Sequence, residues 1–80
     1  MLLKEYLKQN NLKRDILIYE YENDYEYLIA YVKDFNFLGL YDLNASKLIE
    51  KTQADHILST AEVLCEYEME GIKALQVRFN

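Results

Sequence analysis

The sequence contains no proline and no tryptophan, only two glycines and a single cysteine, Cys65. One cysteine cannot close an internal disulfide, which excludes a disulfide scaffold and fits a reducing compartment. Two glycines cannot build a glycine-rich phosphate loop, and the composition is neither collagen-like nor low-complexity. No apolar run approaches the ~18 residues of a membrane span, and Lys4 and Glu5 interrupt the start where a signal peptide would be apolar. We therefore expect a cytoplasmic protein that needs no membrane.

The chain has 80 residues, of which 51% are hydrophobic and eight are tyrosine. This apolar content predicts a folded chain rather than a disordered one, and the length predicts a single domain over residues 1–80. A domain of this size buries only roughly 60% of the surface that its unfolded chain exposes. A deep enzyme pocket would hollow out so small a core, so the size favours a protein that acts through its surface.

The net charge of −5 is concentrated in two blocks. Residues 15–32 carry five acids and no base, and residues 52–72 also carry five acids and no base, whereas residues 1–14 are net basic. Direct nucleic-acid binding needs clustered Lys and Arg, so the acidity argues against it. It is compatible with solubility, with a basic protein partner, or with imitation of nucleic acid.

Apolar spacing predicts the first elements. Leu2, Leu3, Tyr6 and Leu7 form a helical stripe, which predicts a short helix over residues 2–10. Residues 15–22 and 25–35 are rich in strand-forming side chains and flank Asn23-Asp24, which predicts a hairpin. A third strand is expected over 37–41, and a helix over roughly 45–53, capped by Asp42 or Asn44.

Residues 55–70 fit two structures. Ser59 and Glu62 match a capping box that would begin a helix. Alternation of apolar and acidic residues over 61–70 instead favours a strand, which Gly71 would join to a last strand at 72–79. We favour the strand, and we predict an α+β fold: a small antiparallel sheet of four to five strands with two or three short helices packed on one face.

The hairpin at 15–35 holds the clearest candidate surface. A loop with an odd number of residues would put on one face a tyrosine-rich set: Leu17, Tyr19, Tyr21, Tyr27, Ile29 and Tyr31. The opposite face would be apolar at its base and acidic toward the turn, and would project past the core. A loop with an even number would instead mix tyrosines and acids on both faces. Tyrosine suits interfaces because it is amphipathic and loses little rotamer entropy on ordering, although ordinary cross-strand packing would use it too.

The second acidic block predicts a row of like charges. In the strand, Glu62, Glu66, Glu68 and Glu70 would line one face, and in a helix three of them would stack on one ridge. Such a row repels itself in the free protein, and a basic partner would relieve the repulsion. A solvated, solubilising face is the simpler explanation.

The sequence offers little support for a catalytic site or a metal site. The pair Cys65 and His56 lies nine residues apart, and Cys65 falls on the apolar side of its segment, which favours a buried and inert thiol. Glu22, Asp24 and Glu26 offer oxygen ligands but lack the EF-hand pattern, and no zinc-type spacing of Cys and His exists. We predict no enzyme activity, no cofactor and no metal.

In size and composition, the chain resembles the small acidic phage-encoded anti-defence inhibitors, a class that includes anti-CRISPR and anti-restriction proteins that imitate nucleic acid. The resemblance is carried by Glu20-Tyr21-Glu22-Asn23-Asp24-Tyr25-Glu26-Tyr27 and by Glu66-Tyr67-Glu68-Met69-Glu70. It implies an inhibitor that occupies a nucleic-acid-binding surface of another protein.

The sequence therefore predicts a non-enzymatic binding module that docks on a basic surface of a nucleic-acid-handling protein and blocks it. The predicted partner-binding residues are Tyr19, Glu20, Tyr21, Glu22, Asp24, Glu26, Tyr27, Glu62, Glu66, Glu68 and Glu70. The alternative is a structural protein that self-associates, as a homodimer for example, through its tyrosine-rich sheet face.

Overall fold

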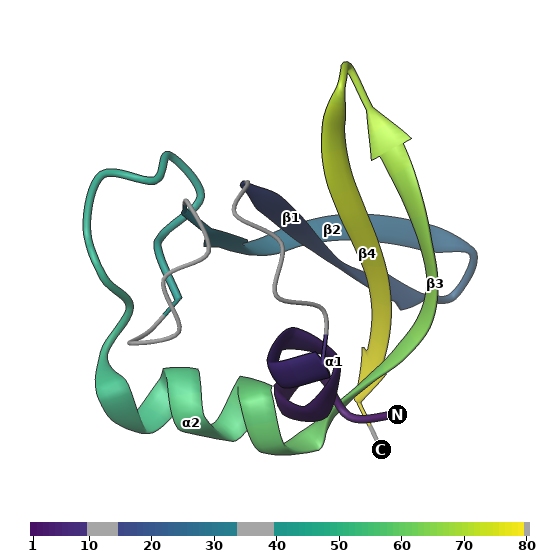
Figure 1. Ribbon diagram of the computed structural model, residues 1–80. Coiled ribbons are helices and arrows are strands. Elements are labelled where there is room, and N and C mark those ends of the chain that lie inside the picture. Colours follow the sequence, from purple (N-terminus) through teal and green to yellow (C-terminus); the bar gives the residue numbers. More distant parts are fainter. Residues whose placement is uncertain (10–14, 34–39, 80) are drawn as a thin grey trace.

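The structure is a computed structural model that describes residues 1–9, 15–33 and 40–79. It contains two helices and four strands (Figure 1). In chain order these are α1 (Leu3–Gln9), β1 (Ile16–Glu22), β2 (Tyr25–Val32), α2 (Lys51–Thr60), β3 (Ala61–Met69) and β4 (Ile72–Phe79). The predicted α+β class is thereby confirmed, with four strands and two helices.

The sheet is mixed rather than antiparallel, with strand order β2-β1-β4-β3. The two hairpins β1–β2 and β3–β4 are antiparallel as predicted, but β4 runs parallel to β1. The reason lies in burial: β4 contains Ala74, Leu75 and Val77, all fully buried, and it takes a central place between β1 and β3. Local sequence patterns do not reveal such long-range pairing.

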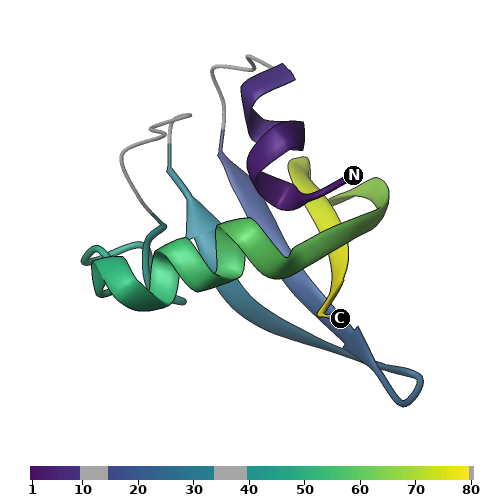
Figure 2. The same cartoon turned by 90° about the horizontal axis from the view of Figure 1, so that it is seen from below.

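Both helices cover the same face of the sheet (Figure 2). Leu3, Tyr6 and Leu7 of α1 and Ala54 and Ile57 of α2 are buried against it. Apolar residues of β1 and β2 meet them from the sheet side. The buried core comprises Leu3, Tyr6, Leu7, Ile16, Ile18, Ala30, Val32, Leu40, Ala54, Ile57, Ala61, Leu75 and Val77. We call the opposite side of the sheet the outer face.

The second helix lies later in the chain than the predicted 45–53. Asp42 does not cap it; its carboxylate accepts hydrogen bonds from Ser46 N (2.8 Å), Ser46 Oγ (2.8 Å) and Asn44 N (3.2 Å), closing a local turn. These bonds, above all those from Ser46, lower the pKa of Asp42.

Helix α2 runs directly into β3 at Ala61. The strand prediction for 61–70 is therefore confirmed over Ala61–Met69, and the Ser59–Glu62 capping box is wrong, because Ser59 Oγ donates to His56 O instead.

Of the predicted strand 37–41, residues 37–39 lie outside the described residues, as do 34–35 of the predicted second strand and residue 10 of the first helix. Tyr41 forms isolated bridges with Tyr31 and Leu48 at the edge of β2. No helix within the described ranges is both long and apolar enough to cross a membrane.

Candidate functional site

The turn between β1 and β2 has two residues, Asn23 and Asp24, with φ of 51° and 67°. Two left-handed residues in succession define the tight hairpin turn that Asn and Asp tolerate well. Tyr21 supports it by donating its hydroxyl to Asp24 Oδ1 at 3.0 Å. The loop therefore has an even number of residues. Next to the turn, Glu22 lies opposite Tyr25, Tyr21 opposite Glu26, and Glu20 opposite Tyr27.

This register contradicts the predicted tyrosine-rich face. Tyr27 pairs with Glu20, so it lies on the opposite side from Tyr19 and Tyr21. The alternative of tyrosines and acids mixed on both faces is what the structure has near the turn. Farther from the turn, a bulge between Ile18 and Tyr19 shifts the strand pairing by one residue. Beyond it, Ile18 lies opposite Ala30, and both are buried. The hairpin therefore keeps an apolar base although its end has mixed faces.

Glu26 is engaged on the outer face. Its carboxylate accepts hydrogen bonds from Tyr67 Oη (2.7 Å) and from Gln76 Nε2 (2.6 Å), and so links β2 to both β3 and β4. Burial, followed by the hydrogen bond to Glu26, raises the pKa of Tyr67. Glu26 thus links β2 to β3 and β4 through bonds from two neutral groups, which orient its carboxylate without cancelling its charge.

Tyr19 belongs to the same cluster. Its ring lies 6.4 Å from that of Tyr67, tilted by 35°, and its hydroxyl donates to Met69 Sδ at 3.1 Å. Ala74, between Leu17 and Tyr67 in the sheet, has no exposed surface. These large side chains therefore cover the outer face themselves.

The second acidic block does not form one row. A bulge between Val63 and Cys65 reverses the alternation, so Glu62 lies on the outer side, opposite Arg78, while Glu66 and Glu68 lie on the helix side. Glu70 lies in the β3–β4 turn with φ of 54°. The same bulge turns Cys65 outward, so its thiol is exposed and not buried as predicted.

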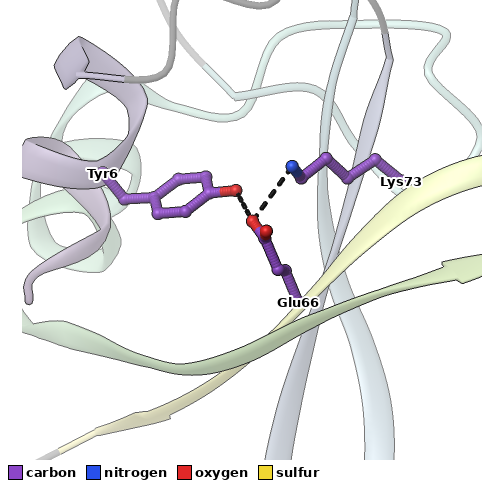
Figure 3. Close-up of polar contacts among 3 residues, drawn as sticks. All are labelled: Tyr6, Glu66 and Lys73. Carbon is purple, nitrogen blue, oxygen red and sulfur yellow. Dashed lines mark hydrogen bonds and ion pairs between the residues drawn. The ribbon is translucent and has the colours of Figure 1, made fainter.

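Glu66 anchors the first helix (Figure 3). Its Oε2 accepts the hydroxyl of Tyr6 and pairs with Lys73 Nζ at 2.9 Å. Lys73, with only 10% of its side chain exposed, also places its ammonium over the Tyr6 ring. Burial and the Glu66 carboxylate raise the pKa of Tyr6; burial opposes the charge on Lys73, but its bonds with Tyr6 and Glu66 outweigh this and raise its pKa.

The end of the β1–β2 hairpin carries a different set, which we call the acidic tip: half-buried Glu20 and exposed Glu22, Tyr25 and Tyr27. By register these four residues share the helix side of the sheet, and Figure 2 shows the hairpin turn projecting beyond both helices. Tyr25 is 67% exposed and Tyr27 is 52% exposed. Among the described residues, neither Glu20 nor Glu22 forms an ion pair with a cation.

The structure thus divides the predicted partner-binding residues. Glu20, Glu22 and Tyr27 come together at the acidic tip, with Asp24 beside them in the turn. Tyr19, Glu26 and Glu66 bond to other side chains of the chain, and Tyr21 supports the turn. Glu62, Glu68 and Glu70 are scattered over β3 and its turn. Tyr25 was missed, although its place directly after Asn23-Asp24 was a usable signal, because a residue that follows a two-residue turn pairs with the last one before it.

The geometry of the described residues offers no support for a metal site or for a reactive thiol. Within the part of the chain that the structure describes, no group of three or more His, Cys, Asp and Glu side chains could hold a metal ion. Cys65 Sγ faces Gln76 Oε1 at 3.6 Å, whereas His56 stacks on Phe79.

Comparison with known proteins gives no guidance, since no known family, curated protein or solved structure matches the chain.

Proposed function

We propose that this protein is a non-enzymatic binding module that docks its acidic tip on a basic surface of a nucleic-acid-handling protein and blocks that surface. The observation that carries the proposal is the acidic tip itself. Two carboxylates that form no ion pair with a described cation lie beside two exposed tyrosines on a hairpin end that projects past the helices.

The spacing of the tip suits such a partner. Glu20 and Glu22 are alternate residues of one strand, so their side chains emerge on one side roughly 6.6–6.8 Å apart. A surface that neutralises phosphates presents Lys and Arg in clusters, and both carboxylates can contact such a cluster together. The exposed rings of Tyr25 and Tyr27 add apolar area and cation-binding faces beside the charges.

The charges act by attraction rather than by proton transfer in this proposal. A general acid or base works best where shelter tunes its pKa, and the tip stands on an exposed strand end. Long-range attraction between opposite charges speeds association and weakens with salt, so salt-sensitive binding is the expected behaviour.

Self-association through the sheet is less well supported. Four strands spaced about 4.8 Å apart and about seven residues long present roughly 450 Å² per copy. Two copies would bury roughly 900 Å², short of the roughly 1,200–2,000 Å² of a stable interface. The outer-face tyrosines Tyr19 and Tyr67 also use their hydroxyls within the chain.

The test is a comparative retention experiment with three immobilised baits and a nuclease-treated lysate. The baits are the wild-type chain, the tip variant E20Q/E22Q and the control variant E68Q/E70Q. The control removes the same charge at the β3–β4 turn, which lies apart from the tip (Figure 1). Glu26 is left intact because its loss would disturb the sheet. Quantitative mass spectrometry compares the retained proteins.

We expect a basic nucleic-acid-binding protein on the wild-type and control baits, lost from the tip variant and released by salt. We also expect the wild-type chain to compete with nucleic acid for that protein. Retention of the same proteins by all three baits would contradict the proposal.

A further inference from the structure

A groove opens beside the acidic tip where two parallel strands separate. The ladder between β1 and β4 ends at Glu20 opposite Val77, although β1 continues to Glu22 and β4 to Phe79. The space between the diverging ends has a volume of about 390 Å³ and is lined by Glu20, Tyr21, Glu22, Asn23, Arg78 and Phe79. We call this space the β1–β4 groove.

We propose that the β1–β4 groove receives an arginine side chain of the basic partner. The proposal rests on the proposed function and names the group that the acidic tip would recognise. Glu20, Glu22 and Phe79 line it on the helix side of the sheet, so two acids and an aromatic ring lie on the same side. Tyr21 and Arg78 line it from the outer side. A guanidinium is planar, binds carboxylates through two parallel hydrogen bonds and stacks on aromatic rings.

Arginine fits this lining better than lysine does. Its flat, weakly hydrated head can bind the carboxylates of Glu20 and Glu22 and contact the ring of Phe79, while its aliphatic stem contacts apolar surface. An ammonium ion is a compact, strongly hydrated point charge and gains less from such a slot. The volume of the groove exceeds what one side chain fills, so neighbouring backbone of the partner has room to enter.

Arg78 does not remove the negative charge of the groove. Its side chain is exposed, and its strand neighbour across the β3–β4 ladder is Glu62. Among the described residues it forms no ion pair with Glu20 or Glu22. Two acids and one base therefore leave the lining with an excess of negative charge for an incoming cation.

The probes are two end-capped tripeptides, Ala-Arg-Ala and Ala-Lys-Ala, titrated at low salt into the full chain labelled with ¹⁵N. We expect the arginine peptide to shift the amide signals of residues 20–23, 78 and 79 first, and to bind at least about threefold tighter than the lysine peptide. Glu22→Gln should weaken the arginine peptide about threefold to fivefold, the range of an exposed ion pair. The matched control Glu70→Gln removes the same charge at the other turn and should leave the affinity unchanged.

Two outcomes would overturn the inference. If both peptides bind equally and shift only residues 25 and 27, or if Glu22→Gln and Glu70→Gln have equal effects, the groove does not select arginine, while the acidic tip can still bind a basic protein. If neither peptide shifts any signal, the groove is not an arginine site. The retention experiment with the three baits then decides the proposed function separately.

Discussion

Glu22 and Glu26 are four residues apart in the sequence, carry the same charge and are both exposed, but they differ in their partners. Glu26 accepts hydrogen bonds from Tyr67 and Gln76, whereas Glu22 forms no ion pair with a described cation. Glu66 is likewise occupied by Tyr6 and Lys73. The sequence singled out acids and tyrosines, but the partner of each one depends on contacts between distant strands, so the contacts of the individual residues could not be predicted.

We expect ionisation of hydrogen-bonded tyrosines to destabilise the fold at alkaline pH. Tyr31 donates its hydroxyl to Asp15 Oδ2 at 2.6 Å, and this bond, helped by burial, raises the pKa of Tyr31 from 10.0 to about 12. A raised pKa in the folded state means that the stabilisation is complete below pH 10 and is lost as the pH rises from 10 to about 12. At neutral pH, we expect the free energy of unfolding of the wild type to be about 0.5 kcal/mol higher than that of Tyr31→Phe. Denaturant unfolding should show this gap closing above pH 10, and a constant gap would refute the assignment.

Both hairpins contain a bulge that reverses the alternation of their strands. The bulge after Ile18 sends Tyr27 to the helix side, and the bulge after Val63 sends Cys65 outward. The sequence did predict both hairpins, the first helix and the last strand, because local periodicity and turn residues encode them. It did not reveal the bulges, which depend on packing, and a slip of one residue moves every later side chain to the other face.

The turn of the second hairpin depends on Gly71. Its φ is +82°, and an added Cβ would meet no atom within 4 Å, so only backbone strain opposes a side chain. Gly71→Ala should therefore lower the free energy of unfolding by roughly 1–2 kcal/mol. Gly71→Asn should cost less, because Asn tolerates left-handed backbone. Urea unfolding of both variants measures this, and equal stability of Ala and Gly at this position would show that the turn is not strained.

In the whole molecule, the core and the acidic tip lie apart. Both helices and the core lie on one side of the sheet, and the acidic tip extends beyond them (Figure 2). The composition and the charge blocks predicted an acidic surface with tyrosines, and the first block does contain it. The β1–β4 groove could not be predicted, because it arises where two strands far apart in the sequence run parallel and then separate.

The central claim is that the acidic tip binds a basic protein by charge. The most direct measurement is the affinity of the captured partner for wild type, E20Q/E22Q and E68Q/E70Q between roughly 50 and roughly 500 mM salt, a range over which the Debye length falls severalfold. We predict that the tip variant binds about tenfold more weakly at low salt, with a flatter salt dependence that meets the wild type at high salt, and that the control follows the wild type. Equal affinity of the tip variant and wild type at both ends of the range would contradict the account.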